Sequence, residues 1–236
     1  MQRDMQRQPP KPATTPNTER LRPTLTTGAQ ALGWALAPEQ EAALLRYLAL
    51  LGRWNQVYNL TAVRDPAEML THHLLDCLAV VRPLRGFLAE RPAPRLLDVG
   101  SGGGLPGIVL ALLCPEVDVT CVDTVGKKAA FIRQAGAELR LANLTAVHAR
   151  VETLPPAPGY DLVTARAFSS LALLEQLTHP LLRANGVWAA MKGQRPDEEM
   201  NELPGRAKVF HVEQLTVPGL DADRCIVWFR PTNDAV

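Results

Sequence analysis

The chain has 236 residues, of which 47% are apolar and 21% are charged, and this composition is typical of a folded globular protein rather than a disordered one. The 25 basic and 24 acidic residues give a net charge of +1, which argues against a nucleic-acid binder that relies on overall charge but leaves room for a local basic patch. The cysteines lie far apart and lack the spacing of a zinc site or a disulfide framework, so we expect reduced thiols and no bound metal. They are Cys77, Cys114, Cys121 and Cys225.

Nothing in the sequence suggests secretion or a membrane. The longest uninterrupted apolar run, residues 108–114, is about a third of what a bilayer requires, and the N-terminal residues lack the apolar segment of a signal peptide. We therefore expect a cytoplasmic protein with no membrane partner. Residues 1–27 are polar and rich in proline, which predicts a disordered tail. An excess of arginine in this tail, including Arg20 and Arg22, favours a weak RNA-contacting arm as the alternative.

Residues 28–90 have the pattern of a helical subdomain. Pro38 suits the first position of a helix, and leucines such as Leu44, Leu48 and Leu51 then repeat at helical spacing. A second helix is expected to start at Asp65, an N-cap residue followed by proline, and to end near Pro83.

Residues 91–236 alternate between strand-like and helix-like segments. Six strands are predicted at residues 95–99, 118–122, 146–149, 161–164, 187–191 and 225–229. Helices are predicted at 105–113, 125–141 and 170–183, with Asn185 and Gly186 ending the last helix and opening a strand. This alternation predicts an α/β fold with a mostly parallel sheet. The segments near Val209 and Cys225 lie close together in sequence, and we expect them to form an antiparallel hairpin at one edge.

The most informative segment is the glycine-rich loop that follows the first predicted strand. Glycines between a strand and a helix let the backbone approach a ligand, and the helix end offers free amide donors. Gly102, Gly104 and Gly107 satisfy the GxGxxG pattern of a dinucleotide-binding site, and Asp123 follows about twenty residues later. The loop therefore allows an NAD-dependent oxidoreductase as one interpretation.

A second interpretation uses the acidic residue before the loop. Asp98 together with Gly100, Gly102 and Gly104 gives DxGxGxG, the first motif of class I S-adenosylmethionine methyltransferases. A carboxylate at Asp98 suits the ammonium group of the methionine moiety, whereas it would repel a pyrophosphate. Asp123 ends the second strand, where it can accept hydrogen bonds from the ribose hydroxyls of either ligand. The position of Asp98 favours S-adenosylmethionine as the cofactor.

Five segments in the same order make the sequence resemble the ribosomal small-subunit methyltransferase G family. They are the loop region of residues 96–134, WNQVYNLTAV from Trp54, HHLLDCL from His72, ARAF from Ala165 and MKGQ from Met191. The resemblance implies a class I, Rossmann-like methyltransferase domain with an N-terminal helical extension. It also implies methyl transfer from S-adenosylmethionine to N7 of a guanosine in a decoding-region loop of 16S rRNA. The substrate would be naked rRNA, a small ribosomal subunit or an assembly intermediate, and we expect the enzyme to be a monomer.

The resemblance also assigns residues to the site. Gly100 and Leu105 belong to the cofactor loop, and Val151 and Glu152 follow the third strand, where the family places an adenine-flanking pair. Arg166 occupies the arginine of ARAF, which places it in the cofactor site as a positioning residue. There it would hold an RNA phosphate, the target base or a carboxylate of the site.

The methyl transfer that the resemblance implies requires little general acid–base catalysis. Guanine N7 carries a free lone pair at neutral pH, so orientation of the reactants supplies most of the catalysis. Lys192, Arg195 and Lys127 are the candidates for contacts with RNA phosphates. A methyltransferase acting on a small molecule or a protein, an NAD-dependent oxidoreductase and a catalytically silent nucleotide- or RNA-binding module remain as alternatives.

Overall fold

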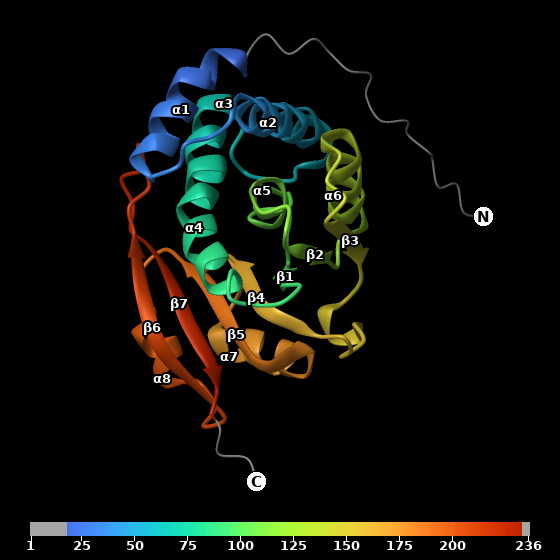
Figure 1. Ribbon diagram of the computed structural model, residues 1–236, viewed down its shortest axis with the longest axis vertical. Coiled ribbons are helices and arrows are strands. Elements are labelled where there is room, and N and C mark those ends of the chain that lie inside the picture. Colours follow the sequence, from blue (N-terminus) through green and yellow to red (C-terminus); the bar gives the residue numbers. More distant parts are fainter. Residues whose placement is uncertain (1–17, 233–236) are drawn as a thin grey trace, which may run out of the picture.

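The computed structural model describes residues 18–232, and its centre is a single seven-stranded sheet (Figure 1). The strands follow the spatial order β3-β2-β1-β4-β5-β7-β6. The first five in that order are parallel, whereas β7 is antiparallel to β5 and β6 is antiparallel to β7. This arrangement confirms the predicted α/β, Rossmann-like fold with an antiparallel hairpin at its edge. The strands are β1 (Arg95–Val99), β2 (Asp118–Asp123), β3 (Leu144–His148), β4 (Tyr160–Arg166), β5 (Leu182–Lys192), β6 (Ala207–Leu215) and β7 (Arg224–Pro231).

Helices cover both faces of the sheet, and most of them lie on one face. This larger layer comprises α1 (Arg22–Ala31), α2 (Pro38–Tyr58), α3 (Pro66–Met69), the π-helical η2 (Leu70–Leu75), α4 (Asp76–Leu88), α5 (Gly107–Leu113) and α6 (Gly126–Leu139). The opposite face carries α7 (Leu171–Thr178) and α8 (Asp197–Asn201). Short 3-10 turns are η1 (Glu19–Leu21), η3 (Val151–Thr153) and η4 (His179–Leu181).

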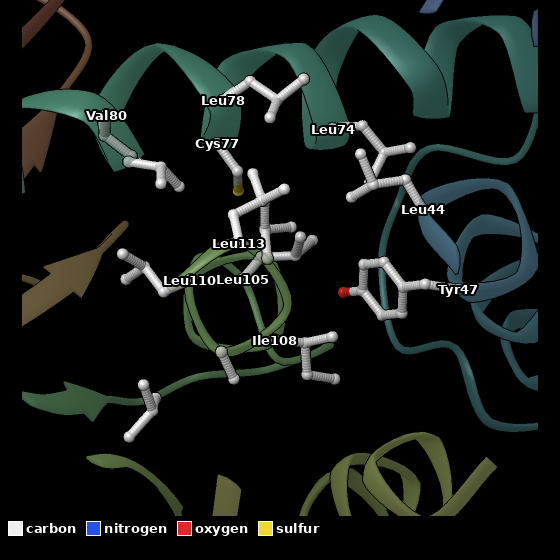
Figure 2. Packing of buried hydrophobic residues seen from close by; sticks show 14 of the residues in the cluster. Leu44, Tyr47, Leu74, Cys77, Leu78, Val80, Leu105, Ile108, Leu110 and Leu113 are labelled. Atoms are coloured by element: carbon white, nitrogen blue, oxygen red, sulfur yellow. The ribbon is translucent and has the colours of Figure 1, made fainter. Parts of the chain in front are cut away.

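Successive side chains of each strand point to opposite faces of the sheet, so alternate residues pack against the two helical layers. In β1, Leu96 packs into the core under the larger helical layer, whereas Leu97 and Val99 pack toward α7 on the other face. The N-terminal helices α2 and α4 enclose α5, which begins directly after the glycine-rich loop (Figure 2). Residues 28–90 therefore share one hydrophobic core with α5 and the sheet.

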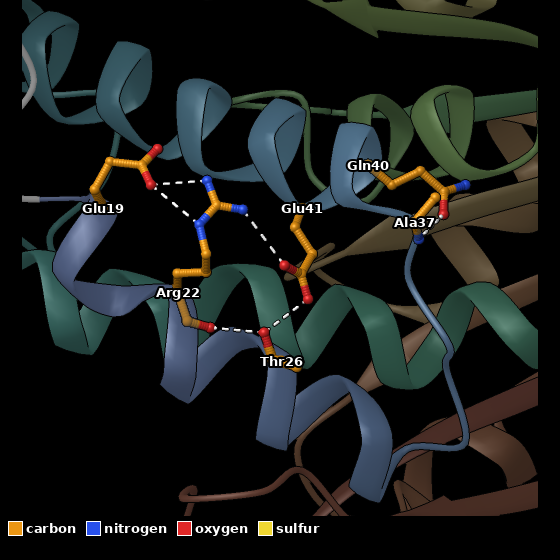
Figure 3. Close-up of polar contacts among 6 residues, drawn as sticks. All are labelled: Glu19, Arg22, Thr26, Ala37, Gln40 and Glu41. Carbon is orange, nitrogen blue, oxygen red and sulfur yellow. Dashed lines mark hydrogen bonds and ion pairs between the residues drawn. The ribbon is translucent and has the colours of Figure 1, made fainter.

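The predicted boundary of the tail at residue 27 is wrong, because residues 19–31 form η1 and α1 and pack on the rest of the chain. Leu25 is fully buried, and Pro23 lies in the first helical turn, where its missing N–H costs nothing. Arg22 bonds to Glu19 and to Glu41 of α2 at N–O distances of 2.7 and 3.4 Å, which ties α1 to α2 (Figure 3). The predicted RNA-contacting arm falls mainly on residues 1–17, which lie outside the described residues.

Two predicted helix ends are also wrong. The second N-terminal helix continues through Pro83 to Leu88, because Leu84 and Leu88 bury their side chains fully enough to outweigh the lost hydrogen bond. In the C-terminal half, α7 already ends at Thr178, just before Pro180. Asn185, with φ of +63°, lies inside β5 where the pairing with β4 shifts register, so the Asn-Gly pair forms a bulge rather than a helix end.

Candidate active site

The glycine-rich loop after β1 combines left-handed backbone with open space. Gly102 and Gly104 have φ of +57° and +79°, a region that disfavours residues with a side chain. A Cβ atom on Gly104 would lie 2.4 Å from the side chain of Ile108, so this glycine is required by packing. A Cβ atom on Gly102 would meet only the carbonyl oxygen of Gly100, at 3.9 Å, and both residues line a cavity. Gly100 and Gly102 therefore form an open cradle, whereas Gly104 supports it from behind.

Asp98 lies beneath this loop and has one carboxylate oxygen free. Its side chain is fully buried, and Oδ2 accepts a hydrogen bond from the backbone N–H of Gly107 at 3.0 Å. Within residues 18–232, Oδ1 has no hydrogen-bond partner. Burial raises the pKa of this carboxyl to about 6. A buried carboxylate oxygen without a donor is costly on its own, and an ammonium group that reached it would satisfy it, although Asp98 does not itself line the cavity beside Gly100 and Gly102.

Asp123, at the end of β2, holds the loop from the neighbouring strand. Its carboxylate accepts from the backbone N–H of Gly102 at 2.9 Å and from that of Val125 at 2.8 Å. Each carboxylate oxygen can accept a second hydrogen bond, so Asp123 can hold the loop and a ribose hydroxyl at the same time. The two acidic residues that the sequence analysis selected thus lie directly behind the glycine cradle.

Tyr47 is a further support of the loop that the sequence analysis missed. It lies on α2, is fully buried and donates its hydroxyl to the carbonyl oxygen of Gly103 at 2.6 Å. Figure 2 shows this hydroxyl pointing away from α2 toward α5. The signal was a tyrosine on the leucine stripe of a predicted helix, since a buried tyrosine hydroxyl needs a partner.

Removing this hydroxyl should weaken cofactor binding while leaving the fold intact. Tyr47→Phe keeps the ring beside Phe131 but loses one buried hydrogen bond, worth about 1 kcal/mol. We expect the Kd of S-adenosylhomocysteine, measured by calorimetry, to rise about fivefold. Tyr58→Phe, at the end of the same helix, is the matched control and should leave the Kd unchanged; equal Kd values for both variants would show that the loop does not depend on Tyr47.

The cradle opens into a cavity of about 600 Å³ between the sheet and the N-terminal helices. Its wall combines the glycine loop, the loop after α2, the η2–α4 junction and the ends of β4, β5 and β7. Its polar side chains include Thr61, His73, Asp76, Arg166, Lys192 and Arg224. Leu105 also lines it. The cavity therefore connects the cradle of Gly100 and Gly102 with this polar wall.

Arg166 extends from the end of β4 to the helical layer. Its Nη1 donates to the carbonyl oxygen of His72 at 3.2 Å and to the carboxylate of Asp76 at 3.3 Å. Asp76 is buried and also accepts from Nε of Arg224 at 2.8 Å. The sequence analysis selected neither Asp76 nor Arg224, because 148 residues separate this pair in the chain.

The predicted RNA-contacting residues occupy different environments. Lys192 lines the cavity, but its ammonium group lies 2.8 and 2.9 Å from the two carboxylate oxygens of Glu199. Arg195 lies outside the cavity wall and pairs with Asp197 at 2.7 Å. Lys127 is exposed in the first turn of α6, also outside the cavity wall. The structure brings only Lys192 of these three to the same cavity as Arg166.

Val151 and Glu152 lie in η3, close to the end of β3. Val151 is buried, and Glu152 pairs with Arg150 at 2.6 Å. Neither residue lines the cavity next to Arg166. An adenine flanked by this pair would therefore lie at the β2–β3 side of the loop.

The segment after α2 forms the roof of the cavity and is fixed by side-chain hydrogen bonds. Asn55 donates to the carbonyl oxygen of Val63 and accepts from the backbone N–H of Thr61. Nε2 of His73 lies 2.9 Å from the hydroxyl of Thr61, and burial lowers the pKa of this histidine to about 4. A neutral His73 therefore orders the roof. Asn59 ends α2 in a left-handed conformation, and its side-chain oxygen accepts from Nη2 of Arg64 at 2.8 Å.

Comparison with known proteins identifies the family. The family described as rRNA small subunit methyltransferase G (GidB) matches residues 40–227. The chain belongs to this family. It is therefore a methyltransferase.

Sequence relatives in the methyltransferase G family match nearly the whole chain. Ribosomal RNA small subunit methyltransferase G of Leptothrix cholodnii is 61% identical over 214 residues, which cover 91% of this chain and 97% of the relative. The protein of the same description from Acidovorax sp. (strain JS42) is 60% identical and covers 88% of this chain and 94% of the relative.

Solved structures confirm the class I fold that this methyltransferase G family member was expected to have. The N-methyltransferase NodS from Bradyrhizobium japonicum WM9, in complex with S-adenosylhomocysteine, has a TM-score of 0.55 at 14% identity and covers 76% of this chain and 98% of its own. A SAM-dependent methyltransferase from Aquifex aeolicus has a TM-score of 0.53 at 15% identity, and the match covers 72% of this chain and 96% of the Aquifex chain. The match to a methyltransferase family favours the methyltransferase interpretation, with S-adenosylmethionine, over the NAD-dependent oxidoreductase interpretation.

The residues of this family member fit that cofactor. The cradle of Gly100 and Gly102 leaves room for it, and the unpartnered Oδ1 of Asp98 lies buried beneath. Within residues 18–232, no helix is both long and apolar enough to cross a membrane. The same part of the chain contains no group of three histidine, cysteine, aspartate or glutamate side chains arranged to hold a metal ion.

Proposed function

We propose that this chain transfers a methyl group from S-adenosylmethionine to N7 of a guanosine in a decoding-region loop of 16S rRNA. The observation that carries this proposal is the match of residues 40–227 to a family described as rRNA small subunit methyltransferase G. The cavity supports it, because a polar wall directly adjoins the cofactor cradle. The acting species in this proposal is a cytoplasmic monomer, and analytical ultracentrifugation tests its oligomeric state.

In this proposal the residues around the glycine loop hold the cofactor. Asp98 accepts from its ammonium group, Asp123 accepts from its ribose hydroxyls, and Val151 and Glu152 flank its adenine. S-adenosylmethionine, when bound, supplies a methyl group that its sulfonium already activates. The backbone of Gly102, which Asp123 fixes, orients the cofactor toward the cavity.

Positioning rather than base catalysis is the mechanism we propose for the protein's own residues. Guanine N7 has no proton to lose, so an acceptor at the target atom is not required. Burial lowers the pKa of His73 to about 4, which makes its imidazole a weak base, and its Nε2 is engaged with Thr61; both suit a wall residue better than a proton acceptor. Arg166 is held at two points by His72 and Asp76, so its guanidinium group is already in place before substrate binds.

Cofactor binding should weaken in acid through Asp98. Its pKa is about 6, so the carboxylate that attracts the cofactor ammonium becomes neutral as the pH falls below that value. We expect the Kd of S-adenosylhomocysteine to rise about tenfold from pH 7 to pH 5, with calorimetry as the measurement. Asp98→Asn should bind weakly at both pH values, and an equally steep pH dependence in this variant would contradict the role of Asp98.

The reaction itself is tested by mapping 7-methylguanosine. Small-subunit rRNA from cells with and without the gene is analysed by mass spectrometry, and the purified chain is then supplied with unmethylated small subunits, with assembly intermediates or with naked 16S rRNA. We expect one N7-methylated guanosine that disappears without the gene. Unchanged methylation in the deletion strain would overturn the proposal.

A further inference from the structure

The buried carboxylate of Asp76 binds two arginines that come from different strands. Oδ2 lies 3.3 Å from Nη1 of Arg166 on β4, and Oδ1 lies 2.8 Å from Nε of Arg224 on β7. Strand β5 separates β4 from β7 in the sheet, so Asp76 bridges two strands that do not pair with each other. The side chains of Arg166 and Arg224 are each 25% exposed and line the cavity, whereas that of Asp76 is 4% exposed. We refer to Arg166 and Arg224 as the arginine pair.

The positive charge of the cavity resides at this arginine pair. Two guanidinium groups face one carboxylate, which leaves one positive charge in excess, because arginine stays protonated in proteins. The other cations of the cavity wall have carboxylate partners of their own. Lys192 contacts Glu199 at 2.8 Å, and Lys128 lies 4.0 Å from Asp123. An anion entering the cavity would therefore be attracted most strongly to the arginine pair.

The arginine pair also retains hydrogen-bond donors. Arg166 uses Nη1 for His72 and Asp76, and Arg224 uses Nε for Asp76 and Nη1 for the carbonyl oxygen of Asp223. Within residues 18–232, no hydrogen bond involves Nη2 of either arginine. Guanidinium groups with free N–H donors are suited to the oxygens of phosphate.

We propose that the arginine pair binds a phosphodiester group of the RNA strand next to the target guanosine, and that Asp76 is the positioning residue that holds both arginines for it. This inference rests on the proposed rRNA substrate and adds the contact that fixes the nucleotide. A phosphate held here places the attached base within the same cavity as the cofactor cradle. The proposal also moves the main RNA contact from Lys192, Arg195 and Lys127 to Arg166 and Arg224.

The position of Arg224 indicates that the anion bound by the arginine pair is an RNA phosphate rather than the carboxylate of the cofactor. The cofactor cradle lies at the ends of β1 and β2. In the sheet, β7 lies three strands from β1, beyond β4 and β5, on the side of β1 opposite to β2. At a spacing of about 4.8 Å between neighbouring strands, this is roughly 14 Å across the sheet. A second reactant approaching the cofactor from the β5–β7 side would therefore meet Arg224 first.

The test is Arg224→Gln, with Arg230→Gln as the matched control. Arg230 lies on the same strand and is exposed, with its guanidinium group over the ring of Phe210 rather than in the cavity. Both variants remove one positive charge from β7. The assay measures kcat and KM for unmethylated small subunits at several salt concentrations, together with the Kd of S-adenosylhomocysteine and the melting temperature.

For Arg224→Gln we expect KM to rise about tenfold and the salt dependence of log(kcat/KM) to become shallower by about one, as loss of a single phosphate contact predicts. The Kd of S-adenosylhomocysteine should change less than twofold, and Arg230→Gln should match the wild type throughout. A raised Kd with an unchanged KM would assign the anion site to the cofactor carboxylate and overturn the proposal. A lower melting temperature with unchanged KM and salt dependence would show that the arginine pair and Asp76 have only a structural role, and this result would also overturn the proposal.

Asp76→Asn tests the positioning role. The amide weakens the bonds that hold both guanidinium groups in place, so KM should rise as in Arg224→Gln even though the cavity gains positive charge. In the Asp76→Asn/Arg224→Gln double variant the combined effect should be smaller than the sum of the two single effects. Additive effects on KM would show that Asp76 does not act through Arg224. If the wild-type protein leaves all small-subunit RNA unmethylated, the proposed function itself fails. The arginine-pair proposal is tested separately, by comparing the variants with a wild type that is active.

Discussion

Gly102→Val is expected to abolish cofactor binding in a chain that still folds. Valine at φ of +57° adds a strain of about 1–2 kcal/mol, and its methyl groups would occupy the open cradle beside Gly100. The backbone N–H of this residue, which donates to Asp123, would also shift. We expect the Kd of S-adenosylhomocysteine to rise at least ~100-fold, equal to about 2.7 kcal/mol of binding free energy. Calorimetry and circular dichroism measure binding and folding on the same sample.

Gly86→Val is the matched control for this variant. Gly86 is exposed on α4, and no heavy atom lies within 4 Å of a Cβ atom built there. The same glycine-to-valine change should therefore leave cofactor affinity at the wild-type value. Normal binding by Gly102→Val would mean that the cofactor lies elsewhere.

Arg166→Ala is expected to reduce kcat/KM for methylation of small subunits about 100-fold. The change removes a guanidinium group from the cavity wall and leaves the buried carboxylate of Asp76 with Arg224 alone. Loss of one partner from such a pair costs about 2–5 kcal/mol at a binding site. A radiolabelled methyl-transfer assay measures the effect, and the loss should exceed any change in the Kd of S-adenosylhomocysteine.

Arg183→Ala separates this effect from general destabilisation. Arg183 pairs with the buried carboxylate of Asp161 at 2.6 Å, and its side chain is 28% exposed, close to the 25% of Arg166. It lies near the start of β5, at the end of the strand away from Lys192 and the cavity. Its removal should lower the melting temperature and leave kcat/KM unchanged. Equal losses of activity in both variants would exclude a specific role for Arg166.

The sheet and the cofactor loop could be predicted because their signals are local in sequence. The β1 strand was predicted at its exact bounds, and the glycines that follow it lie within a few residues of Asp98. The alternation of strands and helices then implies a parallel order with few alternatives. In the same way, Asp65 caps α3 by accepting from the backbone N–H groups of Ala67 and Glu68.

The polar wall of the cavity could not be predicted because it is assembled from distant segments. Asp76 meets Arg224 only after the π-helical turn of η2 sets the rotation of α4 and the hairpin β6–β7 pairs along β5. The pairing of Lys192 with Glu199 depends on α8, a five-residue helix whose pattern carries little signal. Charge partners of this kind decide which cations remain to bind RNA, and a list of basic residues does not contain that information.

The hydrogen bond between Tyr47 and the Gly103 carbonyl has a consequence for attempts to shorten the protein. A fragment starting at residue 91 would keep every cofactor-loop residue, yet it would lose this bond and expose Leu105, Leu110 and Leu113 to water. Such a fragment is expected to aggregate rather than bind the cofactor on its own. The intact chain should instead unfold in one cooperative thermal transition, with the N-terminal helices and the glycine loop melting together.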